Sequence, residues 1–248
     1  MAAIRGATID AAEVERFTAI APDWWNENGA FRPLHRLNPA RVGYIRDRLA
    51  AHFARDIKAR APFAGLEALD IGCGGGLICE PLARLGFAAT GIDADAAALA
   101  VARAHSAPQG LSIDYRAAAA EDLAAGKRRF DVVLALEVVE HAADPTLFIA
   151  TAASLVKPGG ALLLSTINRT PKAYVATIVG AEYLLRWLPR GTHDYRKFRR
   201  PSELARDVRH AGLSVEDMSG LIYDPWRDAW RLGNELAINY LLFATKPK

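Results

Sequence analysis

The 248-residue sequence predicts an α/β fold, in which a mostly parallel sheet carries helices on both faces. Three observations lead to this prediction. A short apolar run, Ala68–Ile71, ends in a glycine-rich turn at Gly72–Gly76, and a helical pattern starts directly afterwards. A second apolar run closes with the acid Asp93. Beyond it, apolar strand patterns keep alternating with helical ones, which is typical of parallel strands joined by helical crossovers.

The first 64 residues are expected to form a helical cap, Met1–Ala64, over the cleft of the sheet. Asp10–Ala21 has the apolar stripe of an amphipathic helix, and Arg41–Ile57 follows Asn38-Pro39 as a second helix. Between them stand Trp24 and Trp25. Adjacent tryptophans favour a place at a core edge or in a pocket over plain surface.

Residues 65–168 are expected to form the core of the fold. The predicted strands are Ala68–Ile71, Ala88–Ile92, Ser112–Arg116, Phe130–Leu136 and Ala161–Thr166, with a turn at Lys157–Gly160. The predicted helices are Leu77–Leu85, Asp95–Ala107, Ala117–Ala125 and Asp144–Leu155. In such sheets ligands bind beyond the carboxyl ends of the strands, where the candidate site residues cluster.

Residues 169–200 interrupt the alternation and are interpreted as an insertion after the fifth strand. Its apolar, aromatic stretch Tyr174–Leu188 is flanked by basic residues, as in segments that lie in the plane of a membrane. A buried lid helix is the alternative. Residues 201–248 complete the sheet with a helix at Ser202–Ala211, capped by Ser202, and with strands Leu213–Asp217 and Tyr240–Thr245. We expect the last strand to be antiparallel, at or near the edge.

The composition restricts the class of protein. Apolar residues make up 51% of the chain, and a net charge of +3 is too small to indicate nucleic-acid binding. The two cysteines, Cys73 and Cys79, lack the spacing of a disulfide framework or a zinc site, which favours the reducing cytosol. The first residues resemble neither a signal nor a transit peptide, and no stretch is long and apolar enough to span a bilayer.

The glycine turn carries the most specific signal. Gly72 and Gly74 allow positive φ and close approach of a ligand, and an acid such as Asp93 after the next strand typically binds a ribose diol. The third glycine of the dinucleotide fingerprint is replaced by Leu77, which disfavours NAD(P). The full pattern, D-x-G-C-G-x-G, resembles motif I of class I S-adenosylmethionine (SAM)-dependent methyltransferases. The alternative is a tight turn that binds nothing.

Two further residues are candidates for the cofactor site. Glu121, after the third strand, is placed to accept the adenine amino group, and Arg41 is placed to face the carboxylate of SAM. The structural alternatives are a solvated helix start and a solvated arginine.

The segment after the fourth strand suggests chemistry. If it starts a helix, Glu137, Glu140 and His141 lie on one turn and can hold a divalent cation such as Mg²⁺. Alternatively, the acid–histidine pair braces the loop under the cofactor. His141 and His193 are the candidate general bases, since histidine titrates near neutral pH, although either can be structural.

The chain as a whole resembles the ubiquinone-biosynthesis O-methyltransferases, which methylate 3-demethylubiquinol and 2-polyprenyl-6-hydroxyphenol. The matching segments are Trp24–Ile45, Leu69–Gly86, Glu137–Pro145, Val156–Tyr174 and Val179–Phe198. The resemblance implies a seven-stranded Rossmann-like sheet and SAM contacts at Arg41, Gly72, Asp93 and Leu136. It also implies magnesium at the E-x-x-E-H residues, as in eukaryotic relatives, while the short N-terminus suggests a bacterial member.

The expected partners are a polyprenylated phenol or quinol, an anionic membrane surface and other enzymes of ubiquinone biosynthesis, but not nucleic acid. The expected location is the cytoplasm, with peripheral association at the inner membrane. Three alternatives remain open: a SAM methyltransferase for another phenolic or small hydrophobic acceptor, an NAD(P)-dependent oxidoreductase, and a non-catalytic lipid-binding scaffold.

Overall fold

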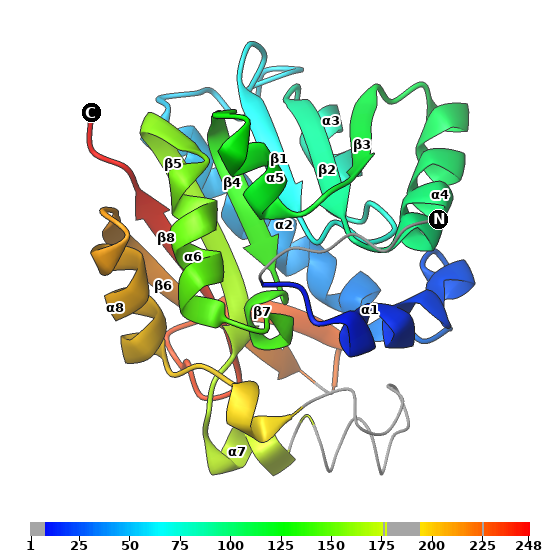
Figure 1. The fold of residues 1–248 in the computed structure, drawn as a ribbon, viewed down its shortest axis with the longest axis vertical. Coiled ribbons are helices and arrows are strands. Elements are labelled where there is room, and N and C mark those ends of the chain that lie inside the picture. Colours follow the sequence, from blue (N-terminus) through cyan, green and yellow to red (C-terminus); the bar gives the residue numbers. More distant parts are fainter. Residues whose placement is uncertain (1–7, 176, 178–193, 225) are drawn as a thin grey trace.

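A twisted sheet forms the centre of the computed structural model, which describes residues 8–175, 177, 194–224 and 226–248 (Figure 1). Within these residues the strand order is β3–β2–β1–β4–β5–β8–β6–β7. The strands are β1 (Glu67–Ile71), β2 (Ala88–Asp93), β3 (Ile113–Ala117), β4 (Phe130–Leu136), β5 (Val156–Ile167), β6 (Ser214–Asp224), β7 (Ala229–Gly233) and β8 (Asn239–Thr245). The first five pair in parallel and the last three antiparallel. The predicted α/β class is confirmed.

Helices cover both faces of the sheet (Figure 1). They are α1 (Ala11–Thr18), α2 (Arg32–His52), α3 (Cys79–Arg84), α4 (Ala96–Ser106), α5 (Ala120–Ala125), α6 (Pro145–Ser154), α7 (Pro171–Ala173) and α8 (Pro201–His210), with short 3₁₀ turns at Ala21–Asp23, Ala107–Gln109, Val139–His141 and Tyr195–Lys197. Apolar side chains of α5, α6 and α8 fill the core on one face of the sheet. Those of α2 and α3 fill the core on the other face. The strand ends between these two cores are therefore held firmly in place.

The strand order reverses between β1 and β4, and this position determines where a ligand can bind. β1 pairs with β2 on one side and with β4 on the other. The helix after β1 packs on one face and the helix after β4 packs on the opposite face. Their carboxyl ends therefore leave a crevice between the two crossovers, which is the usual ligand site in such sheets.

Helix α2 begins at Arg32 rather than at Arg41, so the predicted start of this helix is wrong. Pro33 in the first turn is the true start signal, because a proline there has no N–H to leave unpaired. Pro39 lies inside the helix. Burial of side chains such as Tyr44 and Leu49 holds the helix together despite the hydrogen bond that this proline cannot make.

The antiparallel half of the sheet departs from the prediction. It contains β7, which pairs with β6, so the described residues form eight strands instead of seven. Strand β8 is antiparallel, as predicted. It was expected at or near the edge, and it lies between β5 and β6, with β6 and β7 between it and the edge. The segment of β7 is short, and a sequence pattern of five residues is too brief to distinguish a strand from a loop.

Two local predictions also need correction. The turn predicted at Lys157–Gly160 is a bulge inside β5, because Phe130 pairs with Val156 whereas Val132 pairs with Ala161. Ser202 is not the cap of α8. Arg200 takes that position, and its backbone N–H donates to the Glu203 side chain at 3.1 Å.

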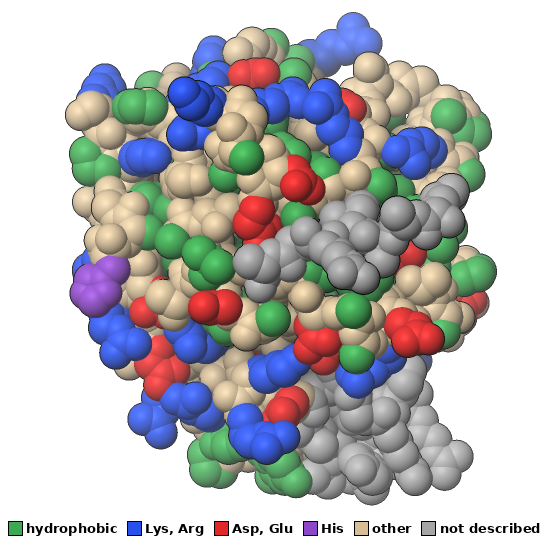
Figure 2. All heavy atoms as spheres, in the orientation of Figure 1, with side chains coloured by type: hydrophobic (Ala, Val, Ile, Leu, Met, Phe, Trp, Pro, Cys, Tyr) green, Lys and Arg blue, Asp and Glu red, His purple; other side chains and the backbone are tan. Residues whose placement is uncertain are grey.

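The face of the molecule in Figure 2 carries Lys and Arg side chains with Asp and Glu side chains between them. Of the described helices, none has both the length and the apolar character needed to cross a membrane.

Candidate cofactor site

A cavity of about 280 Å³ opens at the carboxyl ends of β1, β2 and β4. Apolar side chains of α1 and the start of α2 line one side, including Val14, Phe17 and Leu34. The glycine turn and the charged residues after the strands line the other side. The cavity is near the lower end of the size range for pockets that enclose a small organic ligand.

The glycine turn lines this cavity, and Trp24 leaves no room for a Cβ at two of its positions. Gly72 and Gly74 have φ values of +69° and +50°. A Cβ on Gly74 would lie 2.2 Å from a ring carbon of Trp24, and one on Gly75 would lie 2.5 Å from Trp24 Cβ. Trp24 in turn stacks on Phe31 with ring centroids 3.8 Å apart. The glycines therefore leave room for the cap as well as for a ligand.

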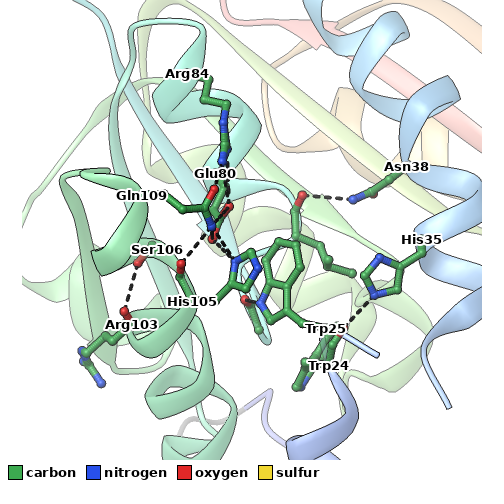
Figure 3. A network of polar contacts seen from close by, with 12 residues as sticks. Trp24, Trp25, His35, Asn38, Glu80, Arg84, Arg103, His105, Ser106 and Gln109 are labelled. Carbon is green, nitrogen blue, oxygen red and sulfur yellow. Dashed lines mark hydrogen bonds and ion pairs between the residues drawn. The ribbon is translucent and has the colours of Figure 1, made fainter. Parts of the chain in front are cut away.

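A polar network joins the cap to the same turn (Figure 3). The Trp25 Nε1–H donates to the Gly75 carbonyl at 2.9 Å, and the Trp25 ring lies flat against His105 at 3.4 Å between centroids. His105 Nδ1 lies 2.6 Å from the buried Glu80 carboxylate. Asn38 Nδ2 donates to the Leu77 carbonyl at 3.0 Å. The tryptophan pair therefore lies at the edge of the core, next to the pocket, as predicted.

Asp93 lies at the end of β2 with both carboxylate oxygens oriented by backbone donors. Oδ2 accepts from Gly74 N–H at 2.8 Å, and Oδ1 accepts from Asp95 N–H at 2.8 Å. Burial raises the pKa of Asp93, and these backbone hydrogen bonds oppose the rise. Each oxygen keeps acceptor capacity that the two ribose hydroxyls of a nucleoside can use.

Arg41 lines the cavity although it is almost fully buried, with 3% of its surface exposed. Its guanidinium donates to Asn38 Oδ1 at 2.6 Å, while its Nε–H has no hydrogen-bond partner in the described part of the chain. Burial lowers the pKa of Arg41, and the charges of Glu137 and Asp70 act in the opposite direction. A buried cation with an unpaired donor is suited to bind an anionic group in the cavity.

Glu121, at the start of α5, also lines the cavity. Its Oε1 accepts from the backbone N–H and the hydroxyl of Thr8, at 2.9 and 2.8 Å. Its Oε2 is buried and has no hydrogen-bond partner among residues 8–175 or the other described residues. Leu136 ends β4 and adds an apolar surface to the same cavity. The unpaired oxygen is therefore available for a donor such as an adenine amino group.

The structure separates the three predicted metal ligands. The backbone turns at Glu137, which has a φ of +57°, and a 3₁₀ turn follows instead of an α-helix. The Glu137 oxygens accept from Ser165 Oγ at 2.6 Å and from Asn239 Nδ2 at 3.1 Å. The carboxylate of Glu140 is buried against the Thr166 hydroxyl at 2.7 Å. No group of three His, Cys, Asp or Glu side chains in the described ranges is placed to hold a metal ion, so these residues do not fit Mg²⁺.

His141 lines the cavity and contacts the cap instead of an acid on its own turn. Its Nδ1 lies 3.2 Å from Glu13 Oε2 on α1, and its ring meets the edge of Phe17. Burial would raise the pKa of Glu13, but the hydrogen bond from His141 and the nearby positive charges lower it. Lys197 also reaches α1, with Nζ 3.0 Å from Asp10 and 3.4 Å from Glu13.

Nine of the ten predicted site residues line the cavity, although they come from separate sequence segments: Arg41, Gly72, Gly74, Asp93, Glu121, Leu136, Glu137, Glu140 and His141. His193 lies outside the described residues. Sequence reasoning missed Glu13, Ser165 and Asn239. Of these three, only Asn239 could have been found from the sequence. If the last strand is antiparallel, its first residue lies beside the carboxyl ends of the parallel strands.

Known proteins resemble this chain over almost its whole length. The family model of a methyltransferase domain matches residues 43–217. The ubiquinone biosynthesis O-methyltransferase of Chelativorans sp. (strain BNC1) is 56% identical over 243 residues, which cover 98% of this chain and 96% of the relative. That of Mesorhizobium japonicum is 52% identical over 242 residues, covering 98% and 97%.

Solved structures support the same fold at low sequence identity. The magnesium protoporphyrin IX methyltransferase from Synechocystis PCC 6803 with bound SAH matches with a TM-score of 0.67 and 20% identity, covering 96% of this chain and 100% of that one. A SAM-dependent methyltransferase from Clostridium acetobutylicum matches with a TM-score of 0.60 and 11% identity, covering 84% and 91%.

Proposed function

Because this chain belongs to the ubiquinone biosynthesis O-methyltransferases, we propose that it methylates hydroxyl groups on polyprenylated ring intermediates, with SAM as the donor. The two acceptors are 3-demethylubiquinol and 2-polyprenyl-6-hydroxyphenol. The observation that carries the proposal is the cavity itself, where Arg41 and Glu121 each keep a polar atom without a hydrogen-bond partner among the described residues. SAM, when bound, supplies a methyl group activated by the sulfonium charge.

The residues of the cavity match the parts of SAM. Asp93 would accept from the ribose hydroxyls, Glu121 from the adenine amino group, and Arg41 would donate to the carboxylate. The glycine turn lets the backbone approach without a Cβ, and Leu136 provides an apolar contact. Methyl transfer from a sulfonium needs in-line placement and a deprotonated oxygen more than covalent assistance.

His141 is the proposed base that removes the proton from the acceptor hydroxyl. A carboxylate only accepts hydrogen bonds, so Nδ1 of His141 carries the proton that faces Glu13. In the neutral ring this leaves the lone pair on Nε2, where a proton can be taken up. Glu13 thus fixes the tautomer of His141. No step is assigned to Mg²⁺, because the donor arrangement does not fit it.

Methyl-labelled SAM and a prenylated catechol, assayed in EDTA and in Mg²⁺, test this function. We expect labelled product in both buffers. His141→Ala should reduce turnover about 100-fold, the usual contribution of a general base, and leave S-adenosylhomocysteine affinity within about twofold. Glu13→Gln should give a smaller loss. Wild-type protein that binds SAM but forms no product would contradict the enzymatic proposal, and full activity of His141→Ala would contradict the assigned base.

The substrate tail suggests where the protein works. A polyprenylated ring resides in a bilayer whereas SAM is dissolved in water, so we infer peripheral association with an anionic inner-membrane surface from the cytoplasmic side. The aromatic and basic composition of Tyr174–Leu188 and its flanks supports this, although most of that stretch lies outside the described residues. At its start, Tyr174 and Val175 are 43% and 59% exposed. Other enzymes of the pathway are proposed partners.

A further inference from the structure

Three ionisable side chains lie near one another in the cavity without forming a closed ion pair. They are Arg41 on α2, Asp70 in β1 and Glu137 after β4, and all three line the cavity. Arg41 is within electrostatic reach of both acids. Its hydrogen bond nevertheless goes to Asn38, and Asp70 Oδ2 faces the Cys79 thiol at 3.4 Å. Separated positive and negative groups around one cavity are complementary to a zwitterion.

Glu137 is the acid of this group whose carboxylate is held in a fixed orientation. Two donors, Ser165 Oγ at 2.6 Å and Asn239 Nδ2 at 3.1 Å, each serve a different oxygen of its carboxylate. These hydrogen bonds fix the direction in which the carboxylate faces. Asp70, by contrast, is buried, and burial raises its pKa to about 7. Glu137 is therefore the better partner for a cation.

The backbone conformation of Glu137 also indicates a ligand site. Its φ of +57° lies in the left-handed region, which residues other than glycine rarely adopt. The surrounding contacts impose this conformation: the Glu137 N–H donates to the Ser165 carbonyl at 3.1 Å, on the neighbouring strand β5. Such conformations cluster at ligand sites, where they aim a side chain.

We propose that Glu137 binds the α-ammonium group of SAM, across from Arg41, which binds the carboxylate on the same carbon. Ser165 and Asn239 are positioning residues that hold the Glu137 carboxylate. This assignment rests on the proposed function and replaces the metal role that the sequence pattern suggested for Glu137. An ammonium group requires one oriented carboxylate, whereas a metal ion would also require Glu140 and His141, which are directed elsewhere.

Calorimetry in EDTA with three ligands tests the assignment. S-Adenosylhomocysteine has both the ammonium and the carboxylate, its deaminated analogue keeps only the carboxylate, and 5′-methylthioadenosine has neither. Glu137→Gln should weaken S-adenosylhomocysteine at least about tenfold, the value of one charge-assisted hydrogen bond. Its affinity for the other two ligands should stay within about twofold of wild type. Glu121→Gln, at the residue proposed to bind the adenine amino group, is the matched control and should weaken all three alike.

Ser165→Ala provides a second variant, which keeps Glu137 but removes the Ser165 hydroxyl that donates to its carboxylate. We expect a loss of about two- to fivefold, again only for the ligand with the ammonium group. Equal losses for all three ligands in Glu137→Gln, unchanged affinity, or a loss seen only with added Mg²⁺ would each overturn the assignment. If wild-type protein failed to bind S-adenosylhomocysteine at all, the proposed function would fall, and this assignment with it.

Discussion

At the scale of single residues, the orientation of the Asp93 carboxylate supports the prediction that it binds the ribose hydroxyls of the cofactor. Two backbone N–H groups fix both of its oxygens. Asp93→Ala should weaken S-adenosylhomocysteine at least about tenfold, since hydrogen bonds to a charged group contribute roughly 1.5–3 kcal/mol each. Calorimetry measures the effect. Asp114→Ala, which removes an exposed acid on β3, is the control, and an equal affinity of the two variants would contradict the role of Asp93.

Asp70 gives the folded protein a defined dependence on pH. Burial raises its pKa to about 7, while in the unfolded chain it ionises near pH 3.9. Between these values the folded state retains a proton that the unfolded state has lost. The contribution of Asp70 to stability is therefore complete below about pH 3.9 and is lost as the pH rises through about 7. Asp70→Asn should flatten this decline.

Chemical unfolding at several pH values between about 4 and 8 tests the prediction. The slope of the unfolding free energy against pH is compared between the variant and wild type, because the absolute stability also changes with the amide. Parallel slopes would show that Asp70 does not retain its proton in the folded state.

At the scale of elements, two glycines of the site region predict opposite effects of the same substitution. Gly43 lies inside α2 with open space around its Cβ position, so Gly43→Ala should stabilise the protein by about 1 kcal/mol, or about 2–4 °C. Gly74→Ala should lower the melting temperature, since its Cβ would collide with Trp24 and its φ is left-handed. Thermal unfolding measures both, and shifts in the same direction would refute the packing of Trp24.

The elements also show what the sequence could predict. The predicted bounds of strand β4 agree with the structure, because the apolar run Val132–Leu136 is too short for a typical helix and belongs to a series of strand patterns that alternate with helices. The helices predicted to start at Asp95 and Asp144 begin one residue later, because both aspartates are N-caps whose side chains accept from backbone N–H groups two or three positions on. The start of α2 was missed because Pro39 looked like a boundary, and only burial against the sheet shows that the helix continues through it.

The site residues likewise divide into those that the sequence could predict and those that it could not. Its glycine turn and Asp93 follow from spacing along one βα unit, so they were found. The contacts of Glu137 bring together residues 28 and 102 positions apart, and those of His141 reach 128 positions back to Glu13. No local pattern encodes such pairs, because they depend on the order of the strands and on where the cap docks.

At the scale of the whole molecule, the exposed start of the 169–200 segment predicts how the protein meets a bilayer. Wild-type protein should co-sediment with phosphatidylglycerol-containing vesicles, and salt should weaken this binding by screening the basic residues. Tyr174→Ser combined with Val175→Ser should reduce pelleting severalfold. Leu232→Ser, a comparably exposed position on β7, is the control. If all three proteins pelleted equally, or none did, a lid would be the better interpretation of the segment.

The contact between Trp24 and the glycine turn also places an intrinsic fluorophore beside the cavity. The indole borders the cavity and stacks on Phe31, and its Nε1–H is buried without a partner in the described part of the chain. Indole emission responds to the charge and polarity of its surroundings, so a sulfonium entering the cavity should change its colour or intensity. Subtracting the signal of Trp24→Phe isolates this one chromophore. Cofactor arrival can then be followed in real time, without a label and independently of turnover.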